Sequence, residues 1–306
     1  MFIEQGVKSE NKFVKYILGS IMIIVASVIG QIPFIAALEF DAAKNGVTYP
    51  KDEAGIMTYF DSNSTLFLIL ISFVFVIIGL ILVVRFLHNQ TMLSVTTARD
   101  KVDWGRIFFS FSVWGALTVV TTLLSYYDNP ADFVFNFKPV PFLILVIIGI
   151  ILIPIQTSAE EYIFRGYLMQ GFANLAKNKW FPLLMTSLIF GGMHFFNPEV
   201  AKMGPIIMIY YIGTGLFLGI ITLMDDGLEL ALGFHAANNL IGALLITSDW
   251  SAFQTHSIFK DISEPSASVD IIVPVLIIYP ILLLIFSKKY QWTNWKDKLT
   301  GKILKF

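Results

Sequence analysis

Apolar residues gather in long runs that recur along the whole chain and are separated by short polar segments. A helix needs about 20 mostly apolar residues to cross a hydrocarbon core of about 30 Å. Runs at or near this length occur at 14–38, 65–87, 105–127, 140–158, 181–196, 205–224, 228–247 and 270–287. Because lipid offers no partner to backbone N–H and C=O groups, each run is expected to be helical. The pattern therefore predicts an all-α, polytopic membrane bundle of about eight transmembrane helices.

The composition excludes several classes of protein. Hydrophobic residues make up 56% of the 306 residues and charged residues 14%, whereas a typical soluble domain is about 25% charged. The formal net charge of −1 lacks the basic excess of a nucleic-acid-binding protein. The chain has no Cys, which rules out disulfide scaffolds, thiolate metal sites and cysteine nucleophiles. We therefore expect the lipid bilayer as a partner, and no nucleic acid.

The distribution of Lys and Arg predicts the orientation in the membrane. These residues are concentrated in the N-terminal segment, in 85–106, in 177–179 and in the tail after 287. Cytoplasmic loops carry the excess of positive charge, so both termini are expected to be cytoplasmic. The loop 225–229 should lie on the same side, although it is acidic and has no Lys or Arg.

The chain is interpreted as a single integral-membrane domain over residues 1–306. No internal repeat relates the first four apolar runs to the last four, and no linker or soluble domain is visible. The absence of Cys and the concentration of Lys and Arg in the predicted cytoplasmic segments are typical of a multi-pass protein of a bacterial cell membrane.

Polar groups at membrane depth are the candidates for chemistry. An ionisable side chain in a spanning helix costs about 2.5–3.5 kcal/mol on insertion scales, so it is a functional candidate by default. Such groups lie at the end of the fourth run and within the fifth and seventh runs: Glu160, Glu161, Arg165, His194 and His235, with the polar amide of Asn239 beside them. The remaining histidines, His88 and His256, fall in loops and are interpreted as solvated.

The two adjacent glutamates are expected to differ in role. Glu161 and Arg165 have the i, i+4 spacing of a helical ion pair, and the structural interpretation is a pair that neutralises two buried charges. Glu160 points about 100° away around the helix. A desolvated carboxylate beside a like charge suits a general base or acid. Pro154 is expected to kink the long helix and to place 155–174 as a separate segment.

The imidazoles lie in patterns with two interpretations. His194 follows a pair of glycines, and a lone His in a helix is more often a packing residue. His235 and Asn239 are i and i+4, so they share one helix face. They could donate two hydrogen bonds to one oxygen, as an oxyanion hole requires. The alternative is a polar clamp between helices.

The ordered set of these residues resembles a known family. It consists of Glu-Glu-x-x-x-Arg at 160–165, Phe-x-x-x-His at 190–194 and His-x-x-x-Asn at 235–239, on three membrane helices. It is similar to the CPBP family of CAAX proteases and bacteriocin-processing enzymes, also called the Abi family. The resemblance covers a protease-like core of about 140–247. The additional spans at 14–38, 65–87, 105–127 and 270–287 match only in general layout.

The resemblance implies an intramembrane glutamic endopeptidase with an eight-helix core. In it, Glu160 would activate a water molecule that His194 also holds. His235 and Asn239 would stabilise the oxyanion. These four side chains are expected to face a common polar cavity that opens toward the cytoplasm.

The resemblance also bears on the surrounding residues and on metal. Glu161 and Arg165 would orient the site. The mechanism is expected to need no metal or other cofactor. A zinc ion held by Glu160, His194 and His235 is the alternative, but Glu160 would then have to be both ligand and base.

The family implies a membrane-associated peptide or membrane protein as substrate, with a role in bacteriocin or pheromone maturation or in self-immunity. One alternative is a non-catalytic membrane scaffold that binds a membrane protein partner, such as a cell-wall enzyme. Another is a proton-coupled transporter, because buried Glu and His residues also form proton relays.

Overall fold

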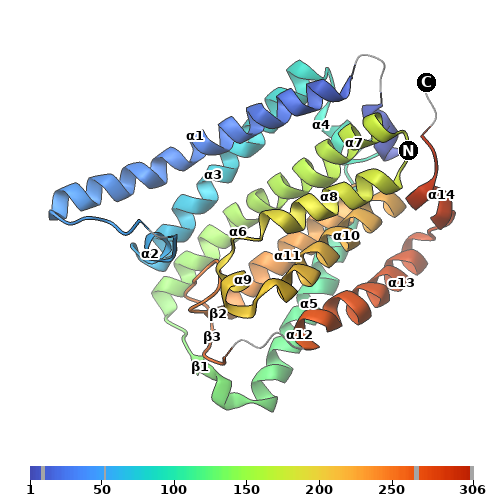
Figure 1. Ribbon diagram of the computed structural model, residues 1–306. Helices are drawn as coiled ribbons and strands as arrows, with labels where there is room; N and C mark the ends of the chain where they lie inside the picture. Colours follow the sequence, from blue (N-terminus) through green and yellow to red (C-terminus); the bar gives the residue numbers. More distant parts are fainter. Residues whose placement is uncertain (8–10, 52, 265–268, 304–306) are drawn as a thin grey trace.

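Helices make up almost all of the regular structure in the computed structural model, which describes residues 1–7, 11–51, 53–264 and 269–303 (Figure 1). The first half contains η1 (Phe2–Gly6), α1 (Phe13–Asn45), α2 (Glu53–Met57), α3 (Ser62–Leu82), η2 (Val83–Leu87), α4 (Met92–Thr96), α5 (Trp104–Asp128), η3 (Pro130–Asp132) and α6 (Pro139–Glu161). The second half contains η4 (Tyr162–Leu168), α7 (Met169–Ala176), α8 (Trp180–Met193), α9 (Pro198–Met203), η5 (Pro205–Ile207), α10 (Met208–Asp225), α11 (Glu229–Leu245), α12 (Val269–Val273), η6 (Pro274–Ile278), α13 (Tyr279–Tyr290) and α14 (Trp295–Thr300).

The eight apolar runs are helical, and the predicted all-α membrane bundle is confirmed. Within the described residues, six helical stretches are long and apolar enough to cross a membrane. The other two predicted spans are shorter: α8 has 14 residues and α11 has 17. A count of eight full spans is therefore not confirmed, because these two helices cover only about 21 and 26 Å at about 1.5 Å per residue.

The fourth helix is continuous where the sequence predicted a break. α6 runs through Pro154 to Glu161, so the separation of 155–174 at this proline is wrong. Proline is tolerated in membrane helices because neighbouring groups satisfy the backbone. The irregularity falls instead at the π-helical turn η4, which starts directly after the two glutamates. Together α6, η4 and α7 form one helical stretch of 38 residues.

The segments rich in Lys and Arg meet at one end of the bundle, called here the basic end. The N-terminal segment, α4, α7, α14 and the described C-terminal residues lie there (Figure 1). Lys179 Nζ is 3.3 Å from an Asp297 carboxylate oxygen, which ties the α7–α8 connection to the tail. Lys8 and Lys305, which add to the charge pattern, lie outside the described residues.

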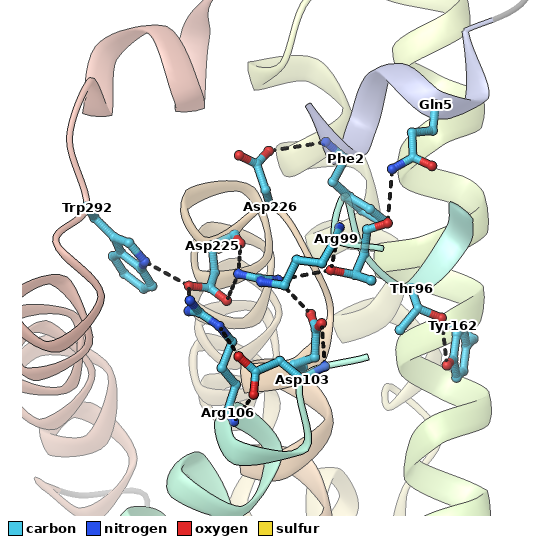
Figure 2. A network of polar contacts seen from close by, with 12 residues as sticks. Phe2, Gln5, Thr96, Arg99, Asp103, Arg106, Tyr162, Asp225, Asp226 and Trp292 are labelled. Carbon is cyan, nitrogen blue, oxygen red and sulfur yellow. Dashed lines mark hydrogen bonds and ion pairs between the residues drawn. The ribbon is translucent and has the colours of Figure 1, made fainter. Parts of the chain in front are cut away.

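The acidic loop 225–229 lies at the basic end as well, which explains why it needs no Lys or Arg of its own. Arg99 Nη2 is 3.0 Å from Asp225 Oδ2, and its Nη1 is 3.1 Å from Glu229 Oε2. Arg106 Nη1 is 2.5 Å from the other Asp225 oxygen, Oδ1 (Figure 2). Lys298 forms an ion pair with Asp226. The acidic residues thus neutralise basic residues from other segments of the same end.

The N-terminal segment 1–7 inserts apolar side chains into the packed interior, which the sequence did not indicate. Phe2 is fully buried and Ile3 is 2% exposed, and both belong to an apolar cluster of the basic end. The Phe2 N–H donates to Asp226 Oδ1 at 3.1 Å (Figure 2). Gln170 Nε2 on α7 donates to the Phe2 carbonyl at 3.3 Å. The N-terminal segment therefore covers helix ends at the basic end.

A small sheet lies at the opposite end of the bundle (Figure 1). Its strands are β1 (Phe133–Phe135), β2 (Ile246–Ser248) and β3 (Phe259–Asp261), in the order β1-β3-β2. β3 pairs antiparallel with β1 and parallel with β2. The sheet ties the α5–α6 connection to the segment that follows α11.

Helix α11 is the best buried of the long helices and carries one of the predicted motifs. Every residue from Glu229 to Ala237 is buried. Its backbone approaches α5 so closely that a Cβ built on Gly233 would lie 2.1 Å from the Ile107 carbonyl oxygen. The Ser110 hydroxyl donates to the Leu230 carbonyl at 2.7 Å across the same contact. α11 also packs against α6, which brings His235 toward the two glutamates.

Candidate active site

Three ionisable side chains from α6, η4 and α11 form a buried cluster. Glu161 Oε1 accepts from Arg165 Nη1 at 2.8 Å, so the predicted i, i+4 ion pair is present. The same oxygen accepts from His235 Nδ1 at 2.7 Å. The guanidinium also stacks over the ring of Phe190, 4.1 Å from its centroid. Glu161 therefore connects the first and third sequence motifs, and Phe190 connects Arg165 to the second.

Glu160 occupies a different environment from its neighbour. Its side chain is 20% exposed, whereas those of Glu161 and Arg165 are fully buried. Oε1 accepts a 2.5 Å hydrogen bond from Gln156 Nε2, one turn earlier on α6. Oε2 lies 3.6 Å from His235 Nε2, beyond hydrogen-bonding distance. Of the two adjacent glutamates, Glu160 is thus the one without a guanidinium partner, and its partly exposed carboxylate can contact another molecule.

The contacts of His235 determine which of its ring nitrogens carries a proton. An ionised carboxylate can only accept, so the nitrogen bonded to Glu161, Nδ1, is the donor. Nε2 can then donate only when the ring carries both protons. In that state the positive charges of His235 and Arg165 balance the negative charges of Glu160 and Glu161. Buried charges are stable when they are paired in this way.

Asn239 reaches the site through Gln156 rather than by a direct contact with Glu160. Its Nδ2 donates to Gln156 Oε1 at 3.0 Å, and Gln156 in turn donates to Glu160. Gln156 is 3% exposed. Sequence reasoning gave this residue no role, although an uncharged amide deep in an apolar helix could have been a signal.

His194 lies at the end of α8 and is held separately. Its Nδ1 is 2.7 Å from the Phe190 carbonyl oxygen, which can only accept. Its ring stacks on Tyr211 at 4.5 Å between centroids. In the neutral ring Nε2 is therefore the unprotonated nitrogen. Within the part of the chain that the structure describes, no hydrogen bond or ion pair joins His194 to Glu160 or His235; Phe190 lies against both rings.

The two histidines that were interpreted as solvated are both engaged. His88 is 1% exposed, and its ring nitrogens contact Asn11 Oδ1 at 3.1 Å and Tyr167 Oη at 3.0 Å. Burial, with a smaller effect of Lys15, lowers the pKa of His88 to about 4, so it is neutral at physiological pH. His256 pairs with Asp61 at 2.9 Å. Neither belongs to the cluster around Glu161.

The residues named for zinc are not gathered into a metal site among the described residues. A zinc-bound imidazole needs a ring nitrogen aimed at the ion from about 2.0–2.1 Å. His235 Nδ1 is bonded to Glu161 and His194 Nδ1 to the Phe190 carbonyl, which leaves each Nε2 open, as in an imidazole that ligates a metal. Across the described ranges, no group of three or more His, Asp or Glu side chains could hold a metal ion. The metal-free site therefore stays a prediction, and zinc at Glu160, His194 and His235 stays its alternative.

The fold and this cluster define a multi-pass membrane protein with a buried polar site between its helices. Residues 136–241 match the type II CAAX prenyl endopeptidase Rce1-like family. The uncharacterized protein YyaK of Bacillus subtilis (strain 168) is 32% identical over 249 residues, which cover 81% of this chain and 82% of the relative. No solved structure matches.

The chain belongs to the Rce1-like family, which confirms the resemblance to CPBP proteins. It is therefore a CAAX-type intramembrane protease, a hydrolase embedded in the membrane. The matched residues coincide with most of the predicted core and include all three motifs.

Proposed function

We propose that the chain is a glutamic-type intramembrane endopeptidase in which Glu160 is the general base. The observation that carries this proposal is the difference in burial and in partners between the two adjacent carboxylates. Glu161 is fully buried and bonded to Arg165 and His235, whereas Glu160 is partly exposed and free of a guanidinium. A carboxylate with an open oxygen can accept a proton from water.

The proposed hydrolysis follows from the atoms that remain available. Glu160 Oε2 takes a proton from water, and the hydroxide attacks the carbonyl carbon of the scissile peptide bond. The doubly protonated His235 donates a hydrogen bond from Nε2 to the oxyanion. Asn239 donates a second hydrogen bond to the oxyanion with the N–H that is not bonded to Gln156. Collapse of the intermediate breaks the C–N bond, and Glu160 returns its proton to the leaving amine.

His194 is proposed to hold the attacking water. Its Nε2 can accept a hydrogen bond from that water because Nδ1 is committed to the Phe190 carbonyl. Glu161 and Arg165 are proposed as orienting residues, since they fix the donor nitrogen of His235. The common polar cavity of Glu160, His194, His235 and Asn239, open toward the cytoplasm, is part of this proposal.

The proposed substrates are membrane-associated peptides or membrane proteins, with maturation of a bacteriocin or pheromone, or self-immunity, as the biological role. The family membership supports a peptide with a lipid-anchored or membrane-embedded end. The bacterial source of the relative YyaK is compatible with a role of this kind.

Glu160→Gln is expected to lower turnover by about 10²–10⁴-fold, because the amide keeps the shape of the side chain and loses its basicity. The measurement uses purified protein and an internally quenched peptide that ends in a farnesylated Cys-aliphatic-aliphatic-X sequence. The melting temperature of the variant should match that of the unaltered protein. Near-normal cleavage by the variant would refute Glu160 as the base, and no cleavage by the unaltered protein would refute this activity.

Cleavage of the same peptide is expected to continue in the presence of a strong chelator, because the proposed base and oxyanion donors are side chains of the chain itself. Total zinc in the purified protein is measured in parallel by elemental analysis. Stoichiometric zinc, together with activity that is lost on its removal and returns on its addition, would overturn the metal-free mechanism.

A further inference from the structure

Four consecutive side-chain hydrogen bonds lead from α5 through α11 to Glu160. Trp114 Nε1 donates to Asn238 Oδ1 at 3.1 Å, and Asn238 Nδ2 donates to Asn239 Oδ1 at 3.0 Å. Asn239 Nδ2 donates to Gln156 Oε1 at 3.0 Å, and Gln156 Nε2 donates to Glu160 Oε1 at 2.5 Å. Each amide of this chain accepts one hydrogen bond with its oxygen and donates one with its nitrogen.

The direction of this chain is fixed by its two ends. An indole N–H can only donate, and an ionised carboxylate can only accept. The three amides between them must therefore all point the same way, with their N–H groups toward Glu160. Turning any one of them around would place two donors or two acceptors against each other. Hydrogen bonds that are aligned in series polarise one another and strengthen the last one.

The hydrogen-bonded chain is better buried at Trp114 and Gln156 than at the two asparagines between them, which are half-buried. Trp114 is 7% exposed and its ring packs 4.3 Å from that of Phe234, and Gln156 is 3% exposed. At Gln156 a low dielectric strengthens hydrogen bonds and makes an unpaired amide costly. The links also join three helices, α5, α11 and α6. Their relative placement thus decides where the Glu160 carboxylate lies.

We propose that this directed amide chain positions the general base, which makes Trp114, Asn238 and Gln156 positioning residues for the hydrolysis. The inference rests on the proposed role of Glu160. Gln156 holds Oε1, so Oε2 is the oxygen left to face His235 and water. The second N–H of Asn239 stays available for the oxyanion, because the chain uses only one.

The first test observes the chain without any substrate. The protein is labelled with ¹⁵N-Trp in detergent micelles, and the indole resonance of Trp114 is assigned by its loss in Trp114→Phe. In Gln156→Met and in Glu160→Gln this resonance is expected to move upfield, because the indole donates to a less polarised acceptor. The indole of Trp292, which donates to Asp225, should not move. An unchanged Trp114 resonance in both variants would overturn the proposal.

The second test measures cleavage of the farnesylated peptide in a double-mutant cycle. Gln156→Met is expected to lower kcat by about 10-fold or more with KM unchanged, since it removes a hydrogen bond to a charged group. Trp114→Phe should lower kcat less. In the Gln156→Met background Trp114→Phe should have no further effect, because the link between the two is already broken. Multiplying effects in the double variant would instead indicate two independent structural roles.

Matched variants keep these outcomes distinct. Trp292→Phe removes a comparable buried indole outside the chain, and Thr157→Val removes a buried hydroxyl that bonds only to its own helix; both should keep normal kcat. If Gln156→Met does not fold, Asn238→Leu breaks the same chain two links earlier and replaces Gln156→Met in the cycle. If Glu160→Gln is active, the proposed function is refuted. If Glu160→Gln is inactive but Gln156→Met is fully active, only the positioning role of the amide chain is refuted.

Discussion

Arg165→Met is expected to cost the protein most of its folded stability. The guanidinium is fully buried, donates to Glu161 at 2.8 Å and to the Gly215 carbonyl at 3.3 Å, and stacks on Phe190. Removing it leaves the buried Glu161 carboxylate with His235 as its remaining ionisable partner, and breaking a buried ion pair typically costs about 3–5 kcal/mol. Many proteins have only about 5–15 kcal/mol in total. Thermal unfolding in detergent and the yield of folded protein measure the loss.

Two controls distinguish the effect of leaving Glu161 without its guanidinium partner from the effect of losing the packing of the Arg165 side chain. Arg85→Met makes the same substitution at an exposed position and should unfold at the normal temperature. Adding Glu161→Gln to Arg165→Met removes the stranded carboxylate and should recover part of the stability. Normal stability of the single variant would contradict the importance of this ion pair, and no recovery in the double variant would assign the loss to packing against Phe190.

Gly233→Ala is expected to destabilise the protein by about 1–3 kcal/mol or more, the usual cost of overfilling a packed contact. The added methyl group would lie 2.1 Å from the Ile107 carbonyl oxygen, so α5 and α11 must move apart. Because His235 follows two residues later, the shift should also reduce cleavage. Thermal unfolding and kcat are measured together.

The control for this prediction is the same substitution on the same helix. A Cβ on Gly242 would have no atom within 4 Å, and alanine is the better helix former by about 1 kcal/mol. Gly242→Ala should therefore leave stability unchanged or raise it. Equal effects of the two substitutions would show that helix propensity, rather than the approach of α5, determines the outcome.

The apolar pattern was enough to predict the helices, because lipid leaves the backbone little choice. The distribution of Lys and Arg predicted that the basic segments meet at one end. The run at 181–196 was already short, as α8 is, but the apolar pattern did not predict the π-helical turn after Glu161. Pro154 illustrates the limit. A local rule predicted a break there, and the structure continues the helix.

The candidate site was predictable where charge made a residue costly, and less so where the residue was neutral. The Glu161–Arg165 pair follows from spacing alone. The bond from His235 to Glu161 was not predicted, because it depends on how α11 packs on α6. Gln156, Asn238 and Trp114 carry no charge and form their chain only across three helices. His88 looked like a loop residue, yet the N-terminal segment and Tyr167 enclose it.

The buried N-terminal segment has a consequence for the timing of biosynthesis. Phe2 bonds to Gln170 and to Asp226, which follow it by 168 and 224 residues. At about 5–20 residues per second, the ribosome needs about 11–45 s to make the second of these partners after the first residues emerge. During that interval Phe2 and Ile3 have no place to pack. Their docking is therefore a late event in assembly and comes after most of the helices have been made.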